Sequence, residues 1–177
     1  MTHRDAEANT KRAANIRLFV MDVDGTLTDG AMYYSAHGEE LKRFSTRDGM
    51  GITLLQRAGI ECAIITSEMS AIVSRRAEKL RISEVVLGCH DKSTTLTSMA
   101  RRHGIAPEHI AYIGDDVNDE HVMTLCGLTA CPSDASNSIL AVAHIVCGAR
   151  GGNGAVREFA EYVLLAQNKS ITLTENW

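Results

Sequence analysis

A largely apolar run from Ile16 to Met21, with one charged residue at Arg17, ends in two acidic residues, Asp22 and Asp24, with Gly25 directly behind them. A run of this kind is typical of a strand buried on both faces, as in a parallel sheet, and such a strand has little reason to end in unpaired acids. Because the acids are two residues apart, an extended backbone directs both side chains to the same side, roughly 7 Å apart. Each carboxylate then raises the pKa of the other unless a cation lies between them. The pair therefore predicts either a divalent metal site or a proton shared for chemistry.

Gly25 and Thr26, next in the chain, suit a loop that a ligand approaches closely. Glycine leaves room beside the backbone, and threonine adds a hydroxyl and an N–H group, so we expect both residues to bind phosphate. A simple turn after the strand is the plain alternative. A calcium-binding loop fits less well, since its twelfth position needs a glutamate and this chain has Tyr33 there.

The composition is that of one soluble globular domain. The chain has 177 residues, of which 45% are hydrophobic and 23% charged, enough to bury a substantial core. A net charge of −4 gives no basic face for nucleic acid, so anionic ligands need local cations or a metal. The five cysteines are odd in number and lie mostly in apolar stretches, which favours reduced thiols in the cytoplasm. Residues 1 to 15 are polar and carry neither a signal peptide nor a membrane span, so we expect a frayed amino terminus.

Short apolar runs alternate with helical patterns along the rest of the chain. The expected strands are residues 16 to 22, 61 to 66, 84 to 87, 110 to 114, 127 to 131 and 144 to 147. The expected helices are residues 49 to 58, 69 to 81, 92 to 103, 117 to 126, 135 to 141 and 154 to 166. This alternation predicts the α/β class, with a doubly wound parallel sheet that is covered by helices on both faces.

One segment interrupts the alternation. Residues 31 to 44 contain two short runs around Ala36-His37-Gly38, which predicts a β-hairpin inserted after the first strand. The insertion is too short to be a domain, and the chain has no low-complexity linker or internal repeat. We therefore predict a single domain from 16 to 168, preceded by frayed residues 1 to 15 and followed by a tail from 169 to 177.

Polar residues also follow the other expected strands. Residues 66 to 68 (Thr-Ser-Glu) end the second strand, residues 91 and 92 (Asp-Lys) follow the third, and the fourth runs into residues 114 to 119 (Gly-Asp-Asp-Val-Asn-Asp). Each group alone has an ordinary explanation as a helix cap, a strand-end hydroxyl or a solvated charge. Ligands of doubly wound sheets bind where the carboxyl ends of the strands meet. Acids, a hydroxyl and a lysine gathered there favour the transfer of a phosphoryl group.

Together these residues match the four motifs of a known family. Asp22-x-Asp24-Gly25-Thr26, Thr66, Lys92 and residues 114 to 119 resemble the haloacid dehalogenase superfamily, over nearly the whole chain. A short hairpin in place of a cap domain, with residues 41 to 51 and 150 to 158, resembles the capless 3-deoxy-D-manno-octulosonate 8-phosphate phosphatases. Relatives of that subfamily act on phosphates of nine-carbon, sialic-type acids.

The resemblance implies a Rossmann-like core and a phosphatase that works through an aspartyl phosphate. It implies that Asp22 is the nucleophile and that Asp24 is the general acid and base. It also implies that Thr66 and Lys92 contact the transferring phosphoryl oxygens.

The cofactor implied by the resemblance is Mg²⁺. Its ligands would be Asp22, the backbone carbonyl of Asp24, and Asp115, with Asp119 or Asp116 supporting them from behind. The substrate-binding residues that the resemblance implies are Gly25, Thr26, Ser45, Thr46, Arg47, Asp48, Gly49, Thr53, Ser67, Glu68, Arg76, Lys79 and Lys92.

Glu68 leaves the identity of the substrate sugar undecided. Octulosonate phosphatases usually carry arginine there, whereas Glu68 with Arg76 and Lys79 is more similar to the nine-carbon group. Residues 47 to 49 (Arg-Asp-Gly) are more similar to the eight-carbon group. The expected substrate is therefore 3-deoxy-D-manno-octulosonate 8-phosphate or a nine-carbon 9-phosphate, used in making bacterial surface glycans such as lipopolysaccharide.

The resemblance also implies a cytoplasmic homotetramer in which neighbouring subunits complete each active site, with no nucleic-acid or membrane partner. Two other classes of function remain open. A response-regulator receiver has a similar sheet, but the adjacent acids Asp115 and Asp116 have no place in it. A non-catalytic partner of a cytidylyltransferase would not need the catalytic positions, all of which are present.

Overall fold

A seven-stranded sheet forms the centre of the computed structural model, which describes residues 1–172. The strands lie in the order β1-β9-β8-β7-β2-β5-β6. All neighbours are parallel except β1, which pairs antiparallel with β9. The strand bounds are β1 Thr2–His3, β2 Leu18–Met21, β5 Glu61–Ile65, β6 Glu84–Val86, β7 Ile110–Ile113, β8 Leu128–Cys131 and β9 Ile145–Val146.

Strand β2 lies where the winding of the sheet reverses. The chain passes from β2 outward to β5 and β6, then crosses back to β7 and continues to β8 and β9. Met21, the last residue of β2, pairs with Ile64 on one side and with Ile113 on the other. Doubly wound sheets bind ligands at such a switch point. The predicted class and winding are confirmed, and β1 adds one antiparallel edge strand.

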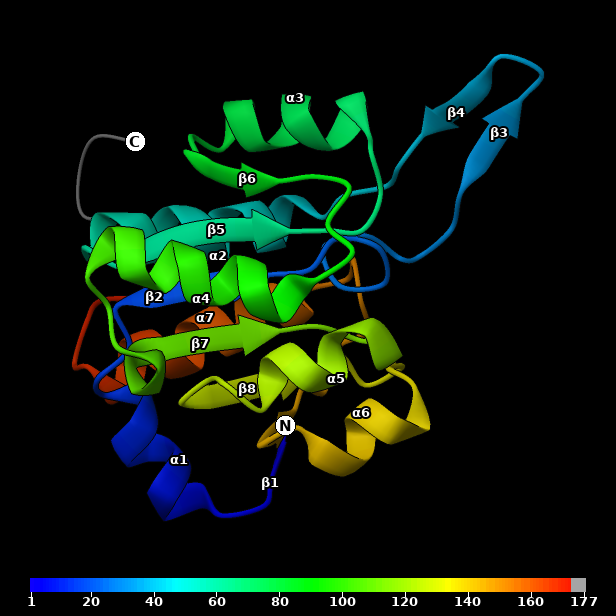
Figure 1. Cartoon of the computed structure of the whole chain (residues 1–177). Coiled ribbons are helices and arrows are strands. Elements are labelled where there is room, and N and C mark those ends of the chain that lie inside the picture. The colour runs from blue at the N-terminus through cyan, green and yellow to red at the C-terminus, as the bar shows by residue number, and fades with distance from the viewer. Residues whose placement is uncertain (173–177) are drawn as a thin grey trace.

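Helices cover both faces of the sheet (Figure 1). Helices α2, α3 and α7 pack on one face, around Ile52 and Phe159, and helices α4, α5 and α6 pack on the other, around Met99 and Val122. Every residue of β2 is buried, as expected for a strand covered on both sides. The helix bounds are α1 Ala6–Ala13, α2 Thr46–Arg57, α3 Ala71–Lys79, α4 Lys92–His103, a 3₁₀ turn Pro107–His109, α5 Val117–Met123, α6 Asn137–Val142 and α7 Ala155–Ala166.

The predicted hairpin is present as β3 (Tyr33–Ser35) and β4 (Gly38–Leu41), which pair antiparallel. It projects beyond the rest of the chain (Figure 1). A bridge between Thr28 and Phe44 closes its base, next to the loop that follows β2. Within residues 1–172 this hairpin occupies the place between β2 and α2 where a cap domain would be inserted.

The prediction of a frayed amino terminus is wrong. Residues 2 and 3 pair with β9, and Asp5 caps α1 by accepting a hydrogen bond from the N–H of Ala8 (3.0 Å). Asn9 is buried and donates to the carbonyl of His144 (3.1 Å), which ties the helix to the sheet. This helix could not be recognised from the sequence, because α1 buries only Asn9 and Ala13, which form no apolar stripe.

The boundaries of the predicted domain (16–168) and tail (169–177) stay predictions, and residues 173–177 of the tail lie outside the described residues. Gln167, just after α7, donates hydrogen bonds to the carbonyls of Ala13 and Ile16 (3.0 and 2.9 Å). In the part of the chain that the structure describes, no helix is both long and apolar enough to cross a membrane.

Candidate active site

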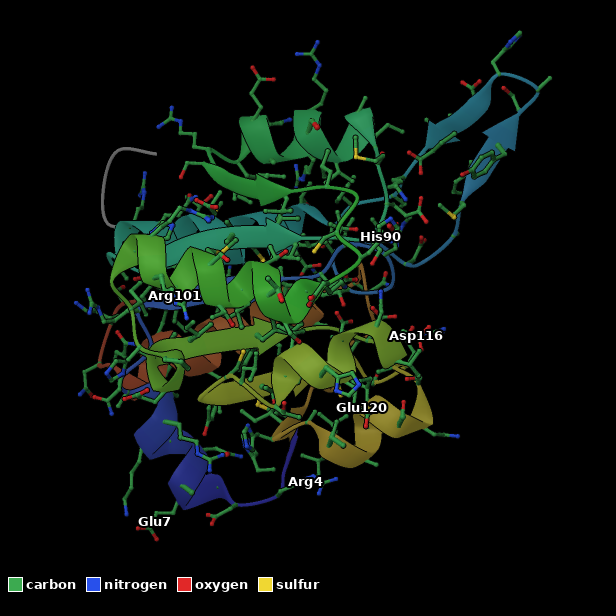
Figure 2. All side chains as sticks on the ribbon, in the orientation of Figure 1. Arg4, Glu7, His90, Arg101, Asp116 and Glu120 are labelled. Carbon is green, nitrogen blue, oxygen red and sulfur yellow. The ribbon has the colours of Figure 1, made fainter. Side chains whose placement is uncertain are left out.

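Three acidic side chains meet at the carboxyl end of the sheet. Asp22 directly follows β2, Asp115 lies in the loop after β7, and Asp119 lies in the first turn of α5. Carboxylate oxygens of the three residues lie within 4.8 Å of one another. Asp116, labelled in Figure 2, lies at the end of the sheet toward which the β7 arrow points. The strand ends thus bring these acids together as the sequence predicted.

Lys92 lies between two of these acids. Its ammonium group donates to Oδ1 of Asp22 and to Oδ1 of Asp119, each at 2.6 Å, and its side chain is almost fully buried. Lys92 is the first residue of α4, whose N-cap residue Asp91 accepts a hydrogen bond from the N–H of Thr94 (2.9 Å). The cap fixes where the helix begins, and therefore where the lysine enters the cluster.

Each of the two carboxylate oxygens of Asp119 accepts two hydrogen bonds. Its Oδ1 accepts from Lys92 and from the hydroxyl of Tyr112 (2.7 Å). Its Oδ2 accepts from the backbone N–H groups of Asp115 (3.0 Å) and Asp116 (3.4 Å). Asp119 is fully buried and holds the turn that carries Asp115, while Asp116 caps α5. Asp119 therefore supports the other acids from behind.

The loop after β2 comes so close to Asp115 that only glycine fits. Gly25 has a φ of 90°, and a Cβ there would lie 2.1 Å from Oδ2 of Asp115. Thr26 is fully buried, and its hydroxyl donates to Oδ1 of Asp115 (3.0 Å). The sequence had suggested that the hydroxyl of Thr26 faces a phosphate. In the structure this hydroxyl orients the carboxylate of Asp115.

Burial and mutual repulsion change the acidity of the cluster. Burial, and then the charge of Asp119, raise the pKa of Asp22 well above its usual value. The same two causes raise the pKa of Asp115 to about 7. Burial alone would lower the pKa of Lys92, but the carboxylates of Asp22 and Asp119 raise it. Negative charge concentrated in this way is stabilised by a cation.

The chemistry of the cluster fits a divalent cation. Oδ2 of Asp22 and Oδ2 of Asp115 accept no hydrogen bond from residues 1–172, because Lys92 and Thr26 bind only the Oδ1 atoms. Carboxylate and carbonyl oxygens are the ligands that Mg²⁺ prefers. Asp22 and Asp115 are therefore placed to hold Mg²⁺, and the backbone carbonyl of Asp24 remains the predicted third ligand.

Two residues of the site, Tyr112 and Lys42, were not predicted from the sequence. Tyr112 lies within β7, where an aromatic residue suggests only core packing, yet its hydroxyl binds Asp119. Lys42 follows β4, and its ammonium group donates to Oδ1 of Asp24 at 2.5 Å. A lysine in a polar hairpin is normally solvated. The only sequence signal for it was the resemblance carried by residues 41 to 51, which include it.

The loop after β5 contributes Thr66, Ser67 and Glu68. Thr66 is buried, and its hydroxyl accepts a long hydrogen bond from the N–H of Glu68 (3.4 Å). Ser67 accepts a hydrogen bond from Nδ2 of Asn118 (3.2 Å), which ties this loop to the start of α5. Glu68 is exposed and forms no ion pair with any residue described. Its carboxylate is open to a ligand.

The start of α2 presents a second group of predicted residues. Ser45 is the N-cap residue and accepts hydrogen bonds from the N–H groups that follow, including that of Arg47 (3.1 Å). Thr46 and Arg47 are exposed. Arg76 lies behind them, because it donates to the carbonyl of Ser45 (3.0 Å), and its guanidinium lies close to Gly49, where a larger side chain would have to displace it. Arg76 thus supports this segment.

Asp48, also predicted to bind substrate, is buried. Its carboxylate accepts hydrogen bonds from the backbone N–H groups of Gly154 (3.2 Å) and Arg157 (2.8 Å). Asp48 therefore joins α2 to α7 and presents no free carboxylate to a ligand.

Thr53 and Lys79 are not brought to the acidic cluster. They line a cavity of about 790 Å³ between α2, α3 and the first residues of β5 and β6, among them Glu61 and Glu84. These are the amino ends of the strands, whereas the acids lie at the carboxyl ends. None of the clustered acids lines this cavity.

Comparison with known proteins identifies relatives of this chain. A family model for haloacid dehalogenase-like hydrolases matches residues 78–159. A 3-deoxy-D-manno-octulosonate 8-phosphate phosphatase from Yersinia pestis is 43% identical over 159 residues, which are 90% of this chain and 85% of that protein.

Several solved structures share the fold, among them two phosphatases with a bound metal ion. One is a 3-deoxy-D-manno-octulosonate 8-phosphate phosphatase from Moraxella catarrhalis in complex with a magnesium ion, a phosphate ion and KDO, with a TM-score of 0.90, 41% identity, and coverage of 93% of this chain and 94% of that one. The other is the cobalt-bound form of such a phosphatase from Haemophilus influenzae, with a TM-score of 0.87, 37% identity, and coverage of 89% and 92%.

Proposed function

The chain belongs to the haloacid dehalogenase-like hydrolases, in the group of the 3-deoxy-D-manno-octulosonate 8-phosphate phosphatases, and we propose that it hydrolyses the phosphate monoester of this eight-carbon sugar acid. It is a phosphoric monoester hydrolase with Mg²⁺ as its cofactor. The observation that carries the proposed substrate is the group of buried Asp22 and Lys92 with half-buried Asp115, in a fold whose Moraxella catarrhalis relative binds magnesium, phosphate and the sugar acid.

Asp22 is the nucleophile of the proposed reaction. An oxygen of its carboxylate bonds to phosphorus while the bond between phosphorus and the sugar oxygen breaks, which leaves an aspartyl phosphate. Two such displacements replace one more difficult displacement by water. Lys92, 2.6 Å from Asp22, neutralises charge on the transferring phosphoryl oxygens, and the hydroxyl of Thr66 donates to one of them.

Asp24 is the general acid and base. A sugar alkoxide is a poor leaving group, so Asp24 gives it a proton as its bond to phosphorus breaks. Asp24 then takes a proton from the water that attacks the aspartyl phosphate. This second step releases inorganic phosphate and restores Asp22.

Asp22, Asp115 and the carbonyl of Asp24 hold the Mg²⁺ in this proposal. The ion supplies positive charge that offsets the carboxylates and the phosphoryl oxygens. Thr26 and Asp119 contribute indirectly, because their hydrogen bonds fix the carboxylate and the backbone of Asp115.

Residues around the cluster, most of them exposed or half-buried, bind the sugar acid. Arg47 pairs with its carboxylate, Ser45, Thr46 and Gly49 shape the same wall, and Ser67 and Glu68 bind hydroxyls on the opposite side. Glu68 also favours a nine-carbon 9-phosphate as a second candidate substrate, since a glutamate here is more similar to the nine-carbon group and its carboxylate accepts hydrogen bonds from sugar hydroxyls.

The active form is a cytoplasmic homotetramer in this proposal, and its product serves the synthesis of bacterial surface glycans such as lipopolysaccharide. Tyr33, Tyr34 and Leu41 of the hairpin are between 48% and 63% exposed, so the hairpin offers apolar surface to a neighbouring subunit. Such a neighbour would close an active site that has no cap domain. All five cysteines are free and buried, as suits a reducing compartment.

The test is phosphate release from 3-deoxy-D-manno-octulosonate 8-phosphate with Mg²⁺, and with EDTA in its place. We expect turnover only with Mg²⁺, and none from Asp22→Asn, which conserves the size of the side chain. Nine-carbon 9-phosphates assayed side by side decide between the two candidate substrates. Folded wild-type protein that releases phosphate from neither class would contradict the proposal.

A further inference from the structure

Lys42, the residue after β4, has no exposed side-chain surface. Its ammonium group pairs with Oδ1 of Asp24 at 2.5 Å and with Oε1 of Glu39 at 2.8 Å. Lysine is almost never fully buried unless it is paired, because removing an ammonium group from water is costly. The hairpin therefore delivers this cation specifically to the loop that follows β2.

The two carboxylate oxygens of Asp24 have different surroundings. Oδ1 accepts the hydrogen bond from Lys42, whereas Oδ2 is buried and has no hydrogen-bond partner among the described residues. A buried acceptor without a donor is destabilising, so each one in a native structure calls for a reason. An oxygen that carries a proton, or that receives one from a bound molecule, has such a reason.

Glu39 and Ser70 hold Lys42 in place on the side away from Asp24. Glu39, which pairs with it, accepts a hydrogen bond at Oε2 from the hydroxyl of Ser70 at 2.5 Å. Ser70 is the N-cap residue of α3, but its hydroxyl makes no capping hydrogen bond and is used for this contact. The series from Asp24 through Lys42 and Glu39 to Ser70 joins the loop after β2, the hairpin and α3, so the ammonium group cannot move freely.

From this geometry we propose that Lys42 is a positioning residue for the proton transfers of Asp24. By binding Oδ1 it fixes the plane of the carboxylate and leaves Oδ2 as the oxygen that exchanges the proton. In the first step the Oδ2–H bond breaks, its electron pair stays on Asp24, and the proton goes to the departing sugar oxygen; in the second step Oδ2 takes a proton from the attacking water. Lys42 contacts no reacting atom and acts through Asp24. The inference rests on the role proposed above for Asp24.

Leaving groups of different basicity test this role. An alkyl phosphate needs a proton on its oxygen as the bond breaks, whereas p-nitrophenolate leaves without one. The measurement is the rate of leaving-group release in the first turnover, which isolates the first step. For Lys42→Met we expect about a 100-fold loss with 3-deoxy-D-manno-octulosonate 8-phosphate, and less than about a fivefold loss with p-nitrophenyl phosphate. Lys42→Arg, which restores a cation, should recover part of the loss with the sugar phosphate. An equal loss on both substrates, or no loss on the sugar phosphate, overturns the proposal.

Two milder variants keep the test decisive if Lys42→Met does not fold. Ser70→Ala and Glu39→Gln weaken the contacts that hold the ammonium group of Lys42 on the side away from Asp24. Both variants should slow the hydrolysis of the alkyl phosphate more than that of the aryl phosphate. Equal effects on the two substrates overturn the proposal here as well. If the wild type does not act on the sugar 8-phosphate but does act on another alkyl phosphate, the proposed substrate is wrong, and the role of Lys42 is decided on that other phosphate.

Discussion

Tyr112 donates its hydroxyl hydrogen to Oδ1 of Asp119 at 2.7 Å, and neither side chain reaches solvent. Burial, and then the charge of Asp119, raise the pKa of Tyr112 well above its usual value, so the phenol stays protonated and keeps its role as donor. The same oxygen of Asp119 accepts from Lys92. A tyrosine within β7 thus helps to hold the lysine and the acids of the site.

Tyr112→Phe should therefore weaken both the fold and the metal site. The variant keeps the packing of the ring but removes one donor from a buried carboxylate, and hydrogen bonds to charged groups are worth about 1.5–3 kcal/mol. We expect a loss of that size in the free energy of unfolding by urea, and weaker Mg²⁺ binding by titration. Tyr162→Phe is the matched control, because its hydroxyl shares only an exposed hydrogen bond with Thr10 (3.1 Å). Equal losses in the two variants would refute the special role of Tyr112.

Gly25→Ala separates backbone strain from damage to the site. The φ of Gly25 is 90° and that of Gly59 is 82°, so alanine is strained at both, by about 1–3 kcal/mol. Only at Gly25 would the new Cβ collide with Asp115; at Gly59 it meets nothing within 4 Å. We expect similar losses of stability, but a fall in kcat of about 100-fold or more for Gly25→Ala alone, since displaced catalytic groups cost that much. Normal kcat in Gly25→Ala would show that the close approach to Asp115 is unimportant.

The raised pKa of Asp115 predicts how stability depends on pH in the absence of metal. Burial and the charge of Asp119 raise this pKa from 3.8 to about 7 on folding. The folded state then holds the proton more tightly than the unfolded chain does, so the contribution of Asp115 favours folding at low pH and is lost as the pH rises from about 4 to about 7. In EDTA we expect the free energy of unfolding to decline over this window, and Mg²⁺ to oppose the decline. Asp115→Asn should make the curve in EDTA flatter; an identical decline in this variant would exclude Asp115 as its source.

Glu68→Arg tests the choice of sugar. Glu68 is exposed beside Ser67 and can accept hydrogen bonds from the hydroxyls of a nine-carbon chain, whereas arginine there could only donate. We expect the ratio of kcat/KM for eight-carbon over nine-carbon substrates to rise about tenfold. Glu108→Arg makes the same charge change in the 3₁₀ turn before β7, at the amino end of that strand, and should leave the ratio unchanged. The idea fails if Glu68→Arg also leaves the ratio unchanged.

Most of the fold could be predicted because its strands are continuous apolar runs that alternate with helices. Leu18 to Met21 is buried throughout, and this pattern has few other solutions than a parallel sheet. The amino terminus could not be predicted in the same way. Its helix is held by a cap at Asp5 and by one buried amide, Asn9, and such contacts leave no periodic signal in the sequence.

The acids of the site could be placed because each follows a strand, and the topology brings strand ends together. The positions of the predicted substrate-binding residues depend instead on the directions in which the helices run. Lys79 ends α3, and at 1.5 Å per residue it lies roughly 12 Å along the helix from Ala71, on the side away from the acids. The contact between Lys42 and Asp24 depends on how the hairpin packs, which no local pattern specifies.

The pairing of Met21 with Ile113 has a consequence for synthesis of the chain. Strand β2 is made early, but its neighbour β7 is separated from it by about 90 residues, and Asp115 follows β7. Ribosomes add roughly 5–20 residues per second, so Asp22 waits several seconds before Asp115, its partner in the proposed metal site, exists. A nascent or truncated chain that ends before β7 is therefore expected to have no hydrolytic activity, and the appearance of activity would report that the central strands have joined.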